Sequence, residues 1–284
     1  MNLMQSITEP AWVSWLKPVT SKCCSCNRSL ALKNVSSHKA GITMQEKWYC
    51  SSRCLTSAAQ KEVVRLLQSR PRRGPQLSRM SLGLSLMSRG LLSRTQYQEA
   101  LDEQRRTGGE LGELVVSKGW VSESQVTTVI AAQWGCAAFA MPTYIVSSGI
   151  HIPLAILEAN AAIPLHYATA TNLLLVGFVH SVSYGLLSAM EQIIECKTQP
   201  CFVTPSEFEV ERERLERERA LLEDASWKEV VSNESQTPAE MAEALCNYCV
   251  EFEAEEAIIR RCNEYIWVRL KASSAKADLL FKVV

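Results

Sequence analysis

The sequence predicts a multidomain α+β fold. We expect a small four-cysteine zinc finger, a tandem helical-hairpin repeat followed by an α/β subdomain, and a C-terminal α-β-β-β unit. Three observations predict it: two closely spaced cysteine pairs, a segment that occurs twice in succession, and short apolar runs that alternate with helical patterns behind it. The 284 residues suffice for two or three domains, and 47% apolar with 21% charged residues is typical of globular proteins.

Shifts in composition along the chain predict five segments. We expect a zinc-finger-like domain, a basic linker, a domain that holds the repeat, a charged helix with a linker, and a small α+β tail domain, over residues 1–69, 70–79, 80–206, 207–236 and 237–284. The net charge is zero, but residues 1–80 carry thirteen Lys/Arg against three Asp/Glu, whereas residues 207–261 carry seven against sixteen. This polarity predicts a basic N-terminal surface and an acidic C-terminal one.

The sequence predicts neither a secretory signal nor a membrane span. Its first residues, MNLMQSITEP, lack a basic start and a long apolar core. Residues Ala137–Val179 hold one formal charge, but prolines interrupt them, and the stretch Leu173–Val179 is far too short to cross a bilayer. We therefore expect a cytoplasmic protein, whose eleven cysteines are metal ligands and core thiols rather than disulfides.

Four of the cysteines form two close pairs, with the spacings Cys-x2-Cys and Cys-x3-Cys: Cys23, Cys26, Cys50 and Cys54. Zn²⁺ prefers four soft ligands in a tetrahedron, and each pair can supply two from one turn. The second pair precedes a helical pattern that runs through Leu67 with Ser51 as its N-cap, so the helix dipole favours thiolates there. The arrangement resembles treble-clef zinc fingers, and we expect a structural zinc ion.

Two neighbouring residues and one alternative remain open at this site. Cys24 is adjacent to Cys23 and is a possible substitute ligand, whereas His38 lies between the pairs and is expected to face solvent. The alternative to zinc is a set of core or redox thiols. A closed four-thiolate site leaves no open coordination position, so we expect no zinc catalysis.

A duplication follows the basic linker. Residues Met80–Arg106 align with Gly109–Gly135 at a constant offset of 29 positions. The identical pairs are Leu82/Leu111, Gly83/Gly112, Ser88/Ser117, Gly90/Gly119, Ser93/Ser122, Gln96/Gln125 and Gln104/Gln133. Each copy predicts a short helix that begins near Leu-Gly and ends at the later glycine, then a Ser-x-x-Gln capping box that opens a second helix. Two such hairpins can pack their apolar faces together.

The tandem unit resembles the N-terminal domain of type II secretion and type IV pilus assembly ATPases, the class with GspE and MshEN domains. The residues after the repeat also match that domain. The repeat leads into Ala131–Gly135, and the motifs I-P-L and L-L-V-G follow at Ile163–Leu165 and Leu174–Gly177. The resemblance covers about residues 80–208.

The α/β half is also predicted directly. Ala162–Ala168 and Asn172–Val179 are expected to be paired strands, Ser183–Cys196 a helix and Gln199–Thr204 a further strand. Three histidines lack a metal spacing and are expected to be ordinary structural residues: His151, His166 and His180.

The resemblance implies a ligand, because the tandem motifs of MshEN domains bind cyclic di-GMP with a leading Arg. Here Ser81 and Glu110 occupy the positions of that Arg, and Glu110 would repel the phosphates. Arg79, Arg105 or Arg106 are the substitutes that the sequence offers. A bound nucleotide would lie across Leu82, Gly83, Leu86, Gly90, Leu111, Gly112 and Gly119.

The remaining residues predict an acidic arm and a small tail. Glu207–Asp224 is typical of a solvated connecting helix and Ser226–Gln236 of a polar break. Thr237, with Pro238 and Glu240, opens a helix in which Cys246 and Cys249 are core thiols. Three strands follow, over Ala257–Cys262, Tyr265–Lys271 and Leu279–Val284, of which the second is expected to bury one face. Their order resembles the domain that precedes the motor core in the same ATPases.

These features predict a non-enzymatic regulatory or adaptor protein that acts by protein–protein docking, with a secretion or pilus assembly ATPase as the partner that the resemblance implies. The dipeptide Gly-Lys of a P-loop occurs nowhere in the chain. One alternative is a cyclic di-GMP sensor with a degenerate motif. Another is a zinc-dependent regulator that binds nucleic acid through the basic N-terminal segment.

Overall fold

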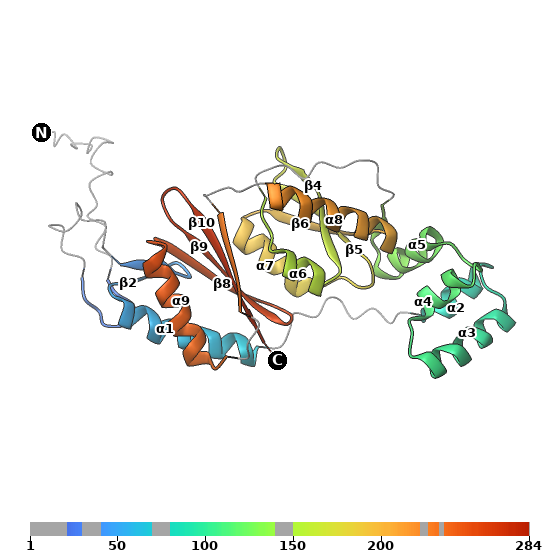
Figure 1. The fold of residues 1–284 in the computed structure, drawn as a ribbon, viewed down its shortest axis with the longest axis horizontal. Coiled ribbons are helices and arrows are strands. Elements are labelled where there is room, and N and C mark those ends of the chain that lie inside the picture. Colours follow the sequence, from blue (N-terminus) through green and yellow to red (C-terminus); the bar gives the residue numbers. More distant parts are fainter. Residues whose placement is uncertain are drawn as a thin grey trace, which may run out of the picture.

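The computed structural model describes residues 22–29, 41–69, 80–139, 150–221, 227–232 and 236–283. Three parts follow one another in space: a six-stranded sheet with two helices, a four-stranded sheet with its own helices, and a group of four helices at the far end (Figure 1). The expected α+β class is confirmed. The basic linker 70–79 and His38 lie outside the described residues.

The six-stranded sheet joins the two ends of the chain. Its strands are ordered β2-β1-β8-β9-β10-β7. Their bounds are β1 (Ile42–Met44), β2 (Lys47–Tyr49), β7 (Trp227–Ser232), β8 (Glu256–Cys262), β9 (Tyr265–Lys271) and β10 (Lys276–Lys282). Thr43 of β1 pairs in parallel with Glu256 of β8, so the N-terminal hairpin forms one edge of a sheet that the C-terminal strands continue. The segments 1–69 and 237–284, expected as separate domains, therefore share one sheet.

Two helices cover one face of this sheet, α1 (Ser52–Gln68) and α9 (Pro238–Glu251). Their apolar stripes meet at Leu55, Ala59 and Leu245, which are buried. Thr237 accepts the expected hydrogen bond from the Glu240 backbone N–H and forms the capping box. Cys246 and Cys249 are buried in this core, as expected for structural thiols.

The opposite face of the sheet is buried as well, which corrects the expectation that Tyr265–Lys271 buries one face. Trp267 is fully buried and Arg269 is 4% exposed. Both lie on the side that packs against the four-stranded part, where Trp267, Tyr265 and Leu280 belong to the same apolar cluster as the helices of that part. The residues alternate along the strand as expected, but its second face meets protein rather than water.

A buried ion pair lies on this second face. Arg269 donates to both carboxylate oxygens of Asp278, through Nε and Nη2 at 3.0 Å each, and Trp267 Nε1 donates to the same carboxylate at 2.7 Å. Arg269 Nη2 also donates to the His151 carbonyl at 2.6 Å, and His151 Nδ1 lies 3.3 Å from Asp278. The pair therefore joins the sheet to the segment that leads into the four-stranded part.

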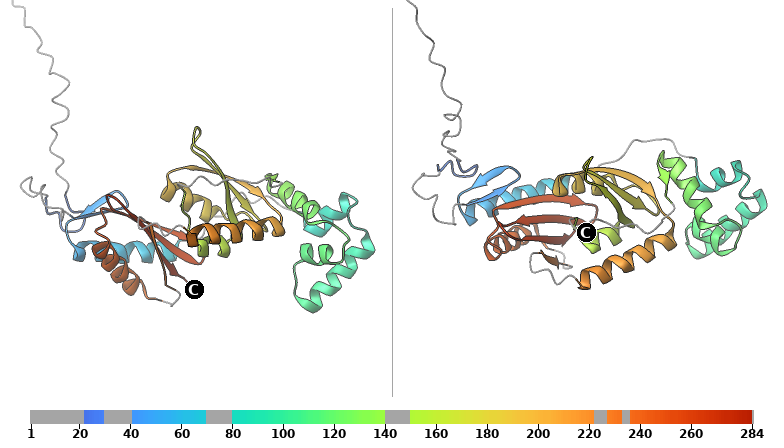
Figure 2. Two further views of the ribbon diagram at one scale, coloured as in Figure 1. Left: turned by 45° about the horizontal axis from the view of Figure 1, so that its top comes forward. Right: turned by 90° about the horizontal axis from the view of Figure 1, so that it is seen from above.

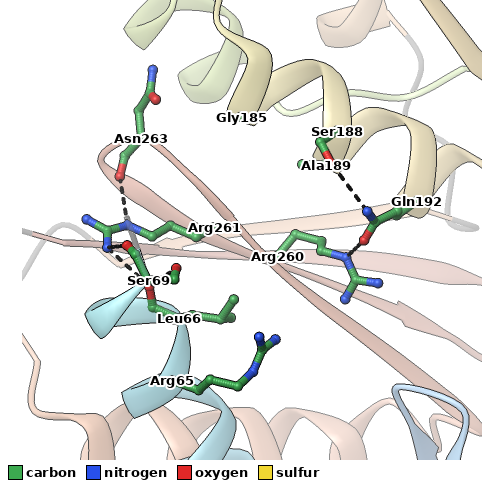
Figure 3. Close-up of a pocket in the computed structure, with 10 residues that line it drawn as sticks. All are labelled: Arg65, Leu66, Ser69, Gly185, Ser188, Ala189, Gln192, Arg260, Arg261 and Asn263. Carbon is green, nitrogen blue, oxygen red and sulfur yellow. Dashed lines mark hydrogen bonds between the residues drawn. The ribbon is translucent and has the colours of Figure 1, made fainter. Parts of the chain in front are cut away.

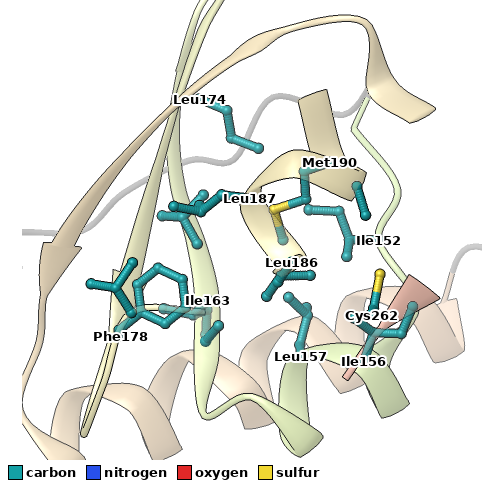
Figure 4. Close-up of a cluster of buried hydrophobic side chains, with 14 of the residues drawn as sticks. Ile152, Ile156, Leu157, Ile163, Leu174, Phe178, Leu186, Leu187, Met190 and Cys262 are labelled. Atoms are coloured by element: carbon teal, nitrogen blue, oxygen red, sulfur yellow. The ribbon is translucent and has the colours of Figure 1, made fainter. Parts of the chain in front are cut away.

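The four-stranded part has the order β3-β6-β5-β4. It comprises β3 (Ala137–Ala138), α6 (Leu154–Ala159), β4 (Ala162–Ala168), β5 (Leu173–Phe178), α7 (Tyr184–Ile194) and β6 (Lys197–Phe202). The expected antiparallel pair is confirmed, since Ala162 of β4 pairs with Phe178 of β5. Figure 4 shows its core, in which Leu186 and Met190 of α7 face Ile156 and Leu157 of α6, with Cys262 from the end of β8 beside them.

Helix α8 (Pro205–Leu221) is less exposed than expected. Phe208 and Leu215 are each 8% exposed and pack on the four-stranded part, and Arg212 Nη1 lies 3.5 Å from Glu158 of α6. The segment expected as a polar break, Ser226–Gln236, holds strand β7, which pairs in parallel with β10. Helix α8 and strand β7 therefore both pack into the fold instead of forming a solvated connection. The many charged residues of α8 form ion pairs within the helix, such as Arg214 with Glu218, and they obscured the few apolar residues in the sequence.

The helical end consists of α2 (Leu82–Ser88), α3 (Arg94–Thr107), α4 (Leu111–Ser117) and α5 (Glu123–Trp134). It contacts the four-stranded part through Trp134, whose ring lies 6.4 Å from Tyr184 and 6.2 Å from Phe202. The two further views in Figure 2 place these four helices away from the six-stranded sheet. No helix in the described part of the chain is long and apolar enough to span a bilayer.

The buried ion pair generates the first prediction. Asp278→Asn leaves the Arg269 charge without its partner, and we expect a loss of about 3–5 kcal/mol in the free energy of unfolding, measured by urea denaturation. Asp102→Asn is the matched control, because Asp102 forms an exposed pair with Arg105 and its loss costs about 0–1 kcal/mol. Equal effects of the two substitutions would contradict the assigned role.

The same pair predicts a pH dependence. Burial opposes ionisation of Asp278, but the hydrogen bond with His151 and the charge of Arg269 outweigh it and lower the pKa of Asp278. A carboxylate whose pKa is lowered on folding contributes stability above its ordinary pKa of about 3.9 and loses it as the pH falls further. The wild-type chain should therefore lose more stability than Asp278→Asn as the pH falls below about 4.

Candidate metal centre and tandem-motif face

The first candidate site is the four-cysteine cluster beside the β1–β2 hairpin. Cys23 and Cys26 lie on a tight turn, in which the Asn27 N–H donates to the Cys23 carbonyl at 2.9 Å. The Cys24 N–H donates to the Trp48 carbonyl at 3.1 Å, which fixes this turn against β2. Cys50 follows β2 directly and Cys54 lies in the first turn of α1. The expected N-cap is confirmed, because Ser51 Oγ accepts from the Cys54 backbone N–H.

The sulfur atoms are spaced as a tetrahedral metal site requires. All four lie within 4.8 Å of one another. Cys26 Sγ and Cys50 Sγ are 3.4 Å apart, and Cys50 Sγ and Cys54 Sγ are 3.9 Å apart. Four thiolates about 2.3 Å from a zinc ion have neighbouring sulfurs about 3.8 Å apart. The four cysteines can therefore bind a metal ion with little movement.

The pKa values of the clustered thiols differ widely because the four sulfur atoms lie so close together. Burial opposes ionisation of Cys23, but backbone N–H groups, first that of Cys50, outweigh it and lower the pKa of Cys23 to about 6. Contact with Cys26, followed by burial, raises the pKa of Cys50 to about 12. Four sulfurs at this spacing cannot all ionise, because each negative charge opposes the next. A bound divalent cation removes that opposition.

Geometry separates Cys24 from the four converging thiols. Within the described residues, the sulfurs that converge are those of Cys23, Cys26, Cys50 and Cys54, whereas Cys24 is exposed and outside the group. Cys23 is fully buried and Cys54 half-buried, so the site faces the core on one side.

The cysteine cluster generates the second prediction. We expect one zinc ion per chain by elemental analysis of the purified protein, and Cys26→Ser or Cys54→Ser should abolish stoichiometric binding and lower the melting temperature. Cys24→Ser is the matched control and should change neither quantity. Retention of zinc by both ligand variants, or its loss from Cys24→Ser, would contradict the assignment.

The second candidate site is the face formed by the tandem motifs. The repeated residues are confirmed in their expected structural roles. Gly90 and Gly119 end α2 and α4 with φ of 69° and 68°, in the left-handed region. The capping boxes that open α3 and α5 are both present, at Ser93 with Gln96 and at Ser122 with Gln125.

The two copies exchange equivalent contacts, which gives the helical end a pseudo-twofold arrangement. A Cβ atom on Gly83 would lie 3.0 Å from Leu111, and one on Gly112 would lie 3.4 Å from Leu82. The glycines thus bring each Leu-Gly pair against the other copy.

The repeated glutamines extend this exchange. Gln104 Nε2 donates to the Gly109 carbonyl at 2.9 Å, and Gln133 Nε2 donates to the Met80 carbonyl at 2.7 Å. Met80 and Gly109 are equivalent positions of the two copies, each directly before the start of a short helix region. The glutamine of each copy therefore binds the backbone at the start of the other copy. This structural role accounts for the presence of the glutamine in both copies.

The residues expected to contact a nucleotide separate into three groups. Leu86 is fully buried and Gly83 is buried beneath Tyr97, so both belong to the core of the helical end. Leu82 and Gly112 line a surface pocket of about 230 Å³, which we call the tandem-motif pocket. The others lie outside its lining: Gly90, Leu111 and Gly119.

The tandem-motif pocket lies between the second helix pair and the four-stranded part. Its floor is apolar, with Val116, Val126 and Ile130, and its carboxylates are Glu110, Glu113 and Glu123. Its lining contains no Lys or Arg of the described residues. Arg105 and Arg106, expected as substitute cations, stand on the last turn of α3 outside this lining, and Arg79 lies outside the described residues.

The positions of the leading Arg have other partners here. Ser81 is the N-cap of α2, and its Oγ accepts from the Leu84 N–H. Glu110 lies 3.2 Å from Nδ1 of His180 in the four-stranded part. The carboxylate of Glu123 accepts from the Ser206 N–H at 3.3 Å. These acidic groups connect the helical end to its neighbour, a function that composition did not reveal.

Comparison with known proteins gives matches among solved structures. Neither the protein-family models nor the curated proteins give a match. The structure of MshE with cdg has 19% sequence identity and a TM-score of 0.40, and the match covers 48% of this chain and 99% of that one. The N-terminal domain of XpsE matches in two crystal structures. One has 17% identity and a TM-score of 0.34, with 47% of this chain and 92% of that chain covered. The other, in crystal form I4122, has 18% identity and a TM-score of 0.27, with 51% of this chain and 99% of that chain covered.

The packing of the repeated glycines generates the third prediction. A Cβ at Gly83 would lie 2.1 Å from the Tyr97 ring, so Gly83→Ala should lower the free energy of unfolding by about 1–3 kcal/mol in denaturant titration. Gly109→Ala is the control, because the nearest atom to its Cβ is 3.7 Å away, and its effect should stay within about 0.5 kcal/mol. A neutral Gly83→Ala would show that close packing does not explain this glycine.

Proposed function

We propose that this chain is a non-enzymatic adaptor or regulatory protein whose tandem-motif pocket docks a protein partner. The observation that carries the proposal is the chemistry of this pocket, which has an apolar floor, three carboxylates and no Lys or Arg in its described lining. Such a surface is complementary to a basic segment with apolar side chains. A phosphodiester ligand would meet repulsion there.

The resemblance of the tandem motifs to secretion and pilus ATPases supplies the class of partner. We infer that the chain docks on a separately encoded assembly ATPase in the cytoplasm.

The metal centre has a structural role in this proposal. Zn²⁺ is the metal that four thiolates at these distances fit best, and a closed four-sulfur site leaves no position for substrate. The ion would hold the turn of Cys23 and Cys26 against the start of α1, next to the edge of the six-stranded sheet. The zinc ion thereby stabilises the sheet rather than taking part in a reaction.

The two alternatives have unequal support. Cyclic di-GMP binding has weaker support, because Ser81 and Glu110 occupy the two positions where the motif has its leading Arg. Glu110 is also paired with His180. Nucleic-acid binding through the basic N-terminal segment stays a prediction of the sequence, because residues 1–21 and 30–40 of that segment lie outside the described residues. Docking is therefore the function that we put forward.

The fourth prediction tests docking at the pocket. Glu113 is exposed and lines the pocket, so Glu113→Lys should weaken binding to the purified secretion or pilus ATPase by about tenfold in biolayer interferometry. Glu243→Lys, which changes an exposed glutamate on α9, is the control for net charge and should bind as the wild type does. Equal binding by both variants, or failure of the wild type to bind, would reject docking through this pocket.

Calorimetric titration of the full chain with cyclic di-GMP tests the principal alternative. We expect no heat of binding. Micromolar affinity that Glu113→Lys strengthens would instead assign the pocket to the nucleotide, because the added cation would favour phosphate.

A further inference from the structure

A second cavity, of about 260 Å³, lies where three parts of the chain meet, and we call it the junction pocket. The last turns of α1 contribute Arg65, helix α7 contributes Gly185 and Gln192, and the β8–β9 hairpin contributes Arg260 and Arg261. Figure 3 shows side chains from these elements around the pocket, with Arg260 extending toward Gln192 and Arg261 extending the opposite way, toward Ser69.

The three arginines are held in place by partners that leave part of each guanidinium available. Arg65 binds Glu62 through Nε and Nη2. Arg261 donates through Nη1 to three carbonyls at the C-terminal end of α1, at 2.8–3.1 Å. Arg260 donates through Nη1 to the Ile259 carbonyl at 2.7 Å and through Nε to Gln192. Within the described part of the chain, Nη1 of Arg65 and Nη2 of Arg260 and Arg261 donate no hydrogen bond.

The charge of this pocket is unbalanced. Its described lining holds three Arg and no Asp or Glu, and neither Arg260 nor Arg261 forms an ion pair with a described residue. Burial lowers the pKa of Arg260, and the neighbouring Arg65 charge lowers it further, whereas Glu62 and Glu46 oppose the shift. Two guanidinium groups that face the same half-buried space repel one another, and an anion between them would remove that repulsion.

Neutral donors complete the pocket. Gly185 lies in the first turn of α7, an eleven-residue helix whose N-terminal end carries a partial positive charge. The side-chain amides of Gln192 and Asn263 are engaged by protein groups, since Gln192 Nε2 donates to Ser188 Oγ at 3.3 Å and Asn263 Nδ2 donates to Ser183 Oγ at 3.2 Å. Guanidinium groups combined with the N–H donors of a helix N-terminus are a set that recognises phosphate oxygens.

We propose that the junction pocket binds a compact phosphoryl anion, either a free phosphate or diphosphate or the phosphate end of a nucleotide. Its volume is below the roughly 300–1,000 Å³ of sites that enclose a drug-sized ligand, which favours an anion inserted phosphate-first. The anion would contact α1, α7 and the β8–β9 hairpin together. Binding would therefore couple the N-terminal helix, the four-stranded part and the C-terminal strands.

The probe for this proposal is sodium diphosphate, titrated into the full chain by calorimetry and by thermal unfolding, with sodium chloride matched for ionic strength. We expect saturable binding and a melting temperature that rises with ligand concentration, because the anion binds the folded chain across several segments. Arg260→Gln should weaken the affinity by about tenfold or more, the effect of losing a charged hydrogen-bonding partner.

Two further variants keep the test decisive if Arg260→Gln fails to fold. The Arg65 side chain is 65% exposed, so Arg65→Glu should fold normally and still weaken diphosphate binding. Arg89→Glu, at the exposed end of α2, is the matched control for charge and should bind as the wild type does. Absence of binding at about 10 mM diphosphate, well above a millimolar dissociation constant, or binding that Arg65→Glu and Arg89→Glu affect equally, would overturn the proposal.

Parallel titrations distinguish the two sources of the phosphoryl group. Tighter binding of a nucleoside diphosphate than of diphosphate would assign the pocket to a nucleotide, whereas equal or weaker binding would assign it to the free anion. Neither result depends on a protein partner, so this test is independent of the docking function proposed above.

Discussion

The burial of both faces of the six-stranded sheet is the constraint on which the rest of the structure depends. One face requires α1 and α9, which come from opposite ends of the chain, and the other requires the four-stranded part. The pair of Arg269 and Asp278 lies on that second face and is itself almost fully buried. The polar network and the apolar contacts therefore fix the same surface, and separation of the parts would expose a charged pair together with the Trp267 ring.

Local signals in the sequence predicted the elements well, because each rests on residues that are near one another in the chain. The capping boxes, the glycine-terminated helices and the pair β4–β5 all appear where spacing placed them. The four converging cysteines belong to this group too, since two short-range pairs define them. The contacts that could not be predicted join residues far apart in the sequence. The pairing of Thr43 with Glu256 and the second buried face of β9 leave no signature in either segment alone.

The same reasoning explains which features of the candidate sites the sequence did not reveal. The absence of a leading Arg at Ser81 and Glu110 is visible in the sequence, but the pairing of Glu110 with His180 is not. The three arginines of the junction pocket come from positions separated by almost two hundred residues, so composition gave no hint that they converge. Basic residues in adjacent positions, as at Arg260 and Arg261, were the one local sign of that cluster.

The pairing between β1 and β8 has a consequence for how the chain is made. Gln45 donates from the β1–β2 hairpin to the Ile259 carbonyl across 214 positions of sequence. During synthesis the hairpin therefore leaves the ribosome long before its partner strand exists, with an unpaired edge of the kind that invites aggregation. The cysteine cluster lies beside β2, on the other side of the hairpin, and is complete once α1 has emerged, so a metal ion captured early would keep the hairpin in shape until the C-terminal strands arrive.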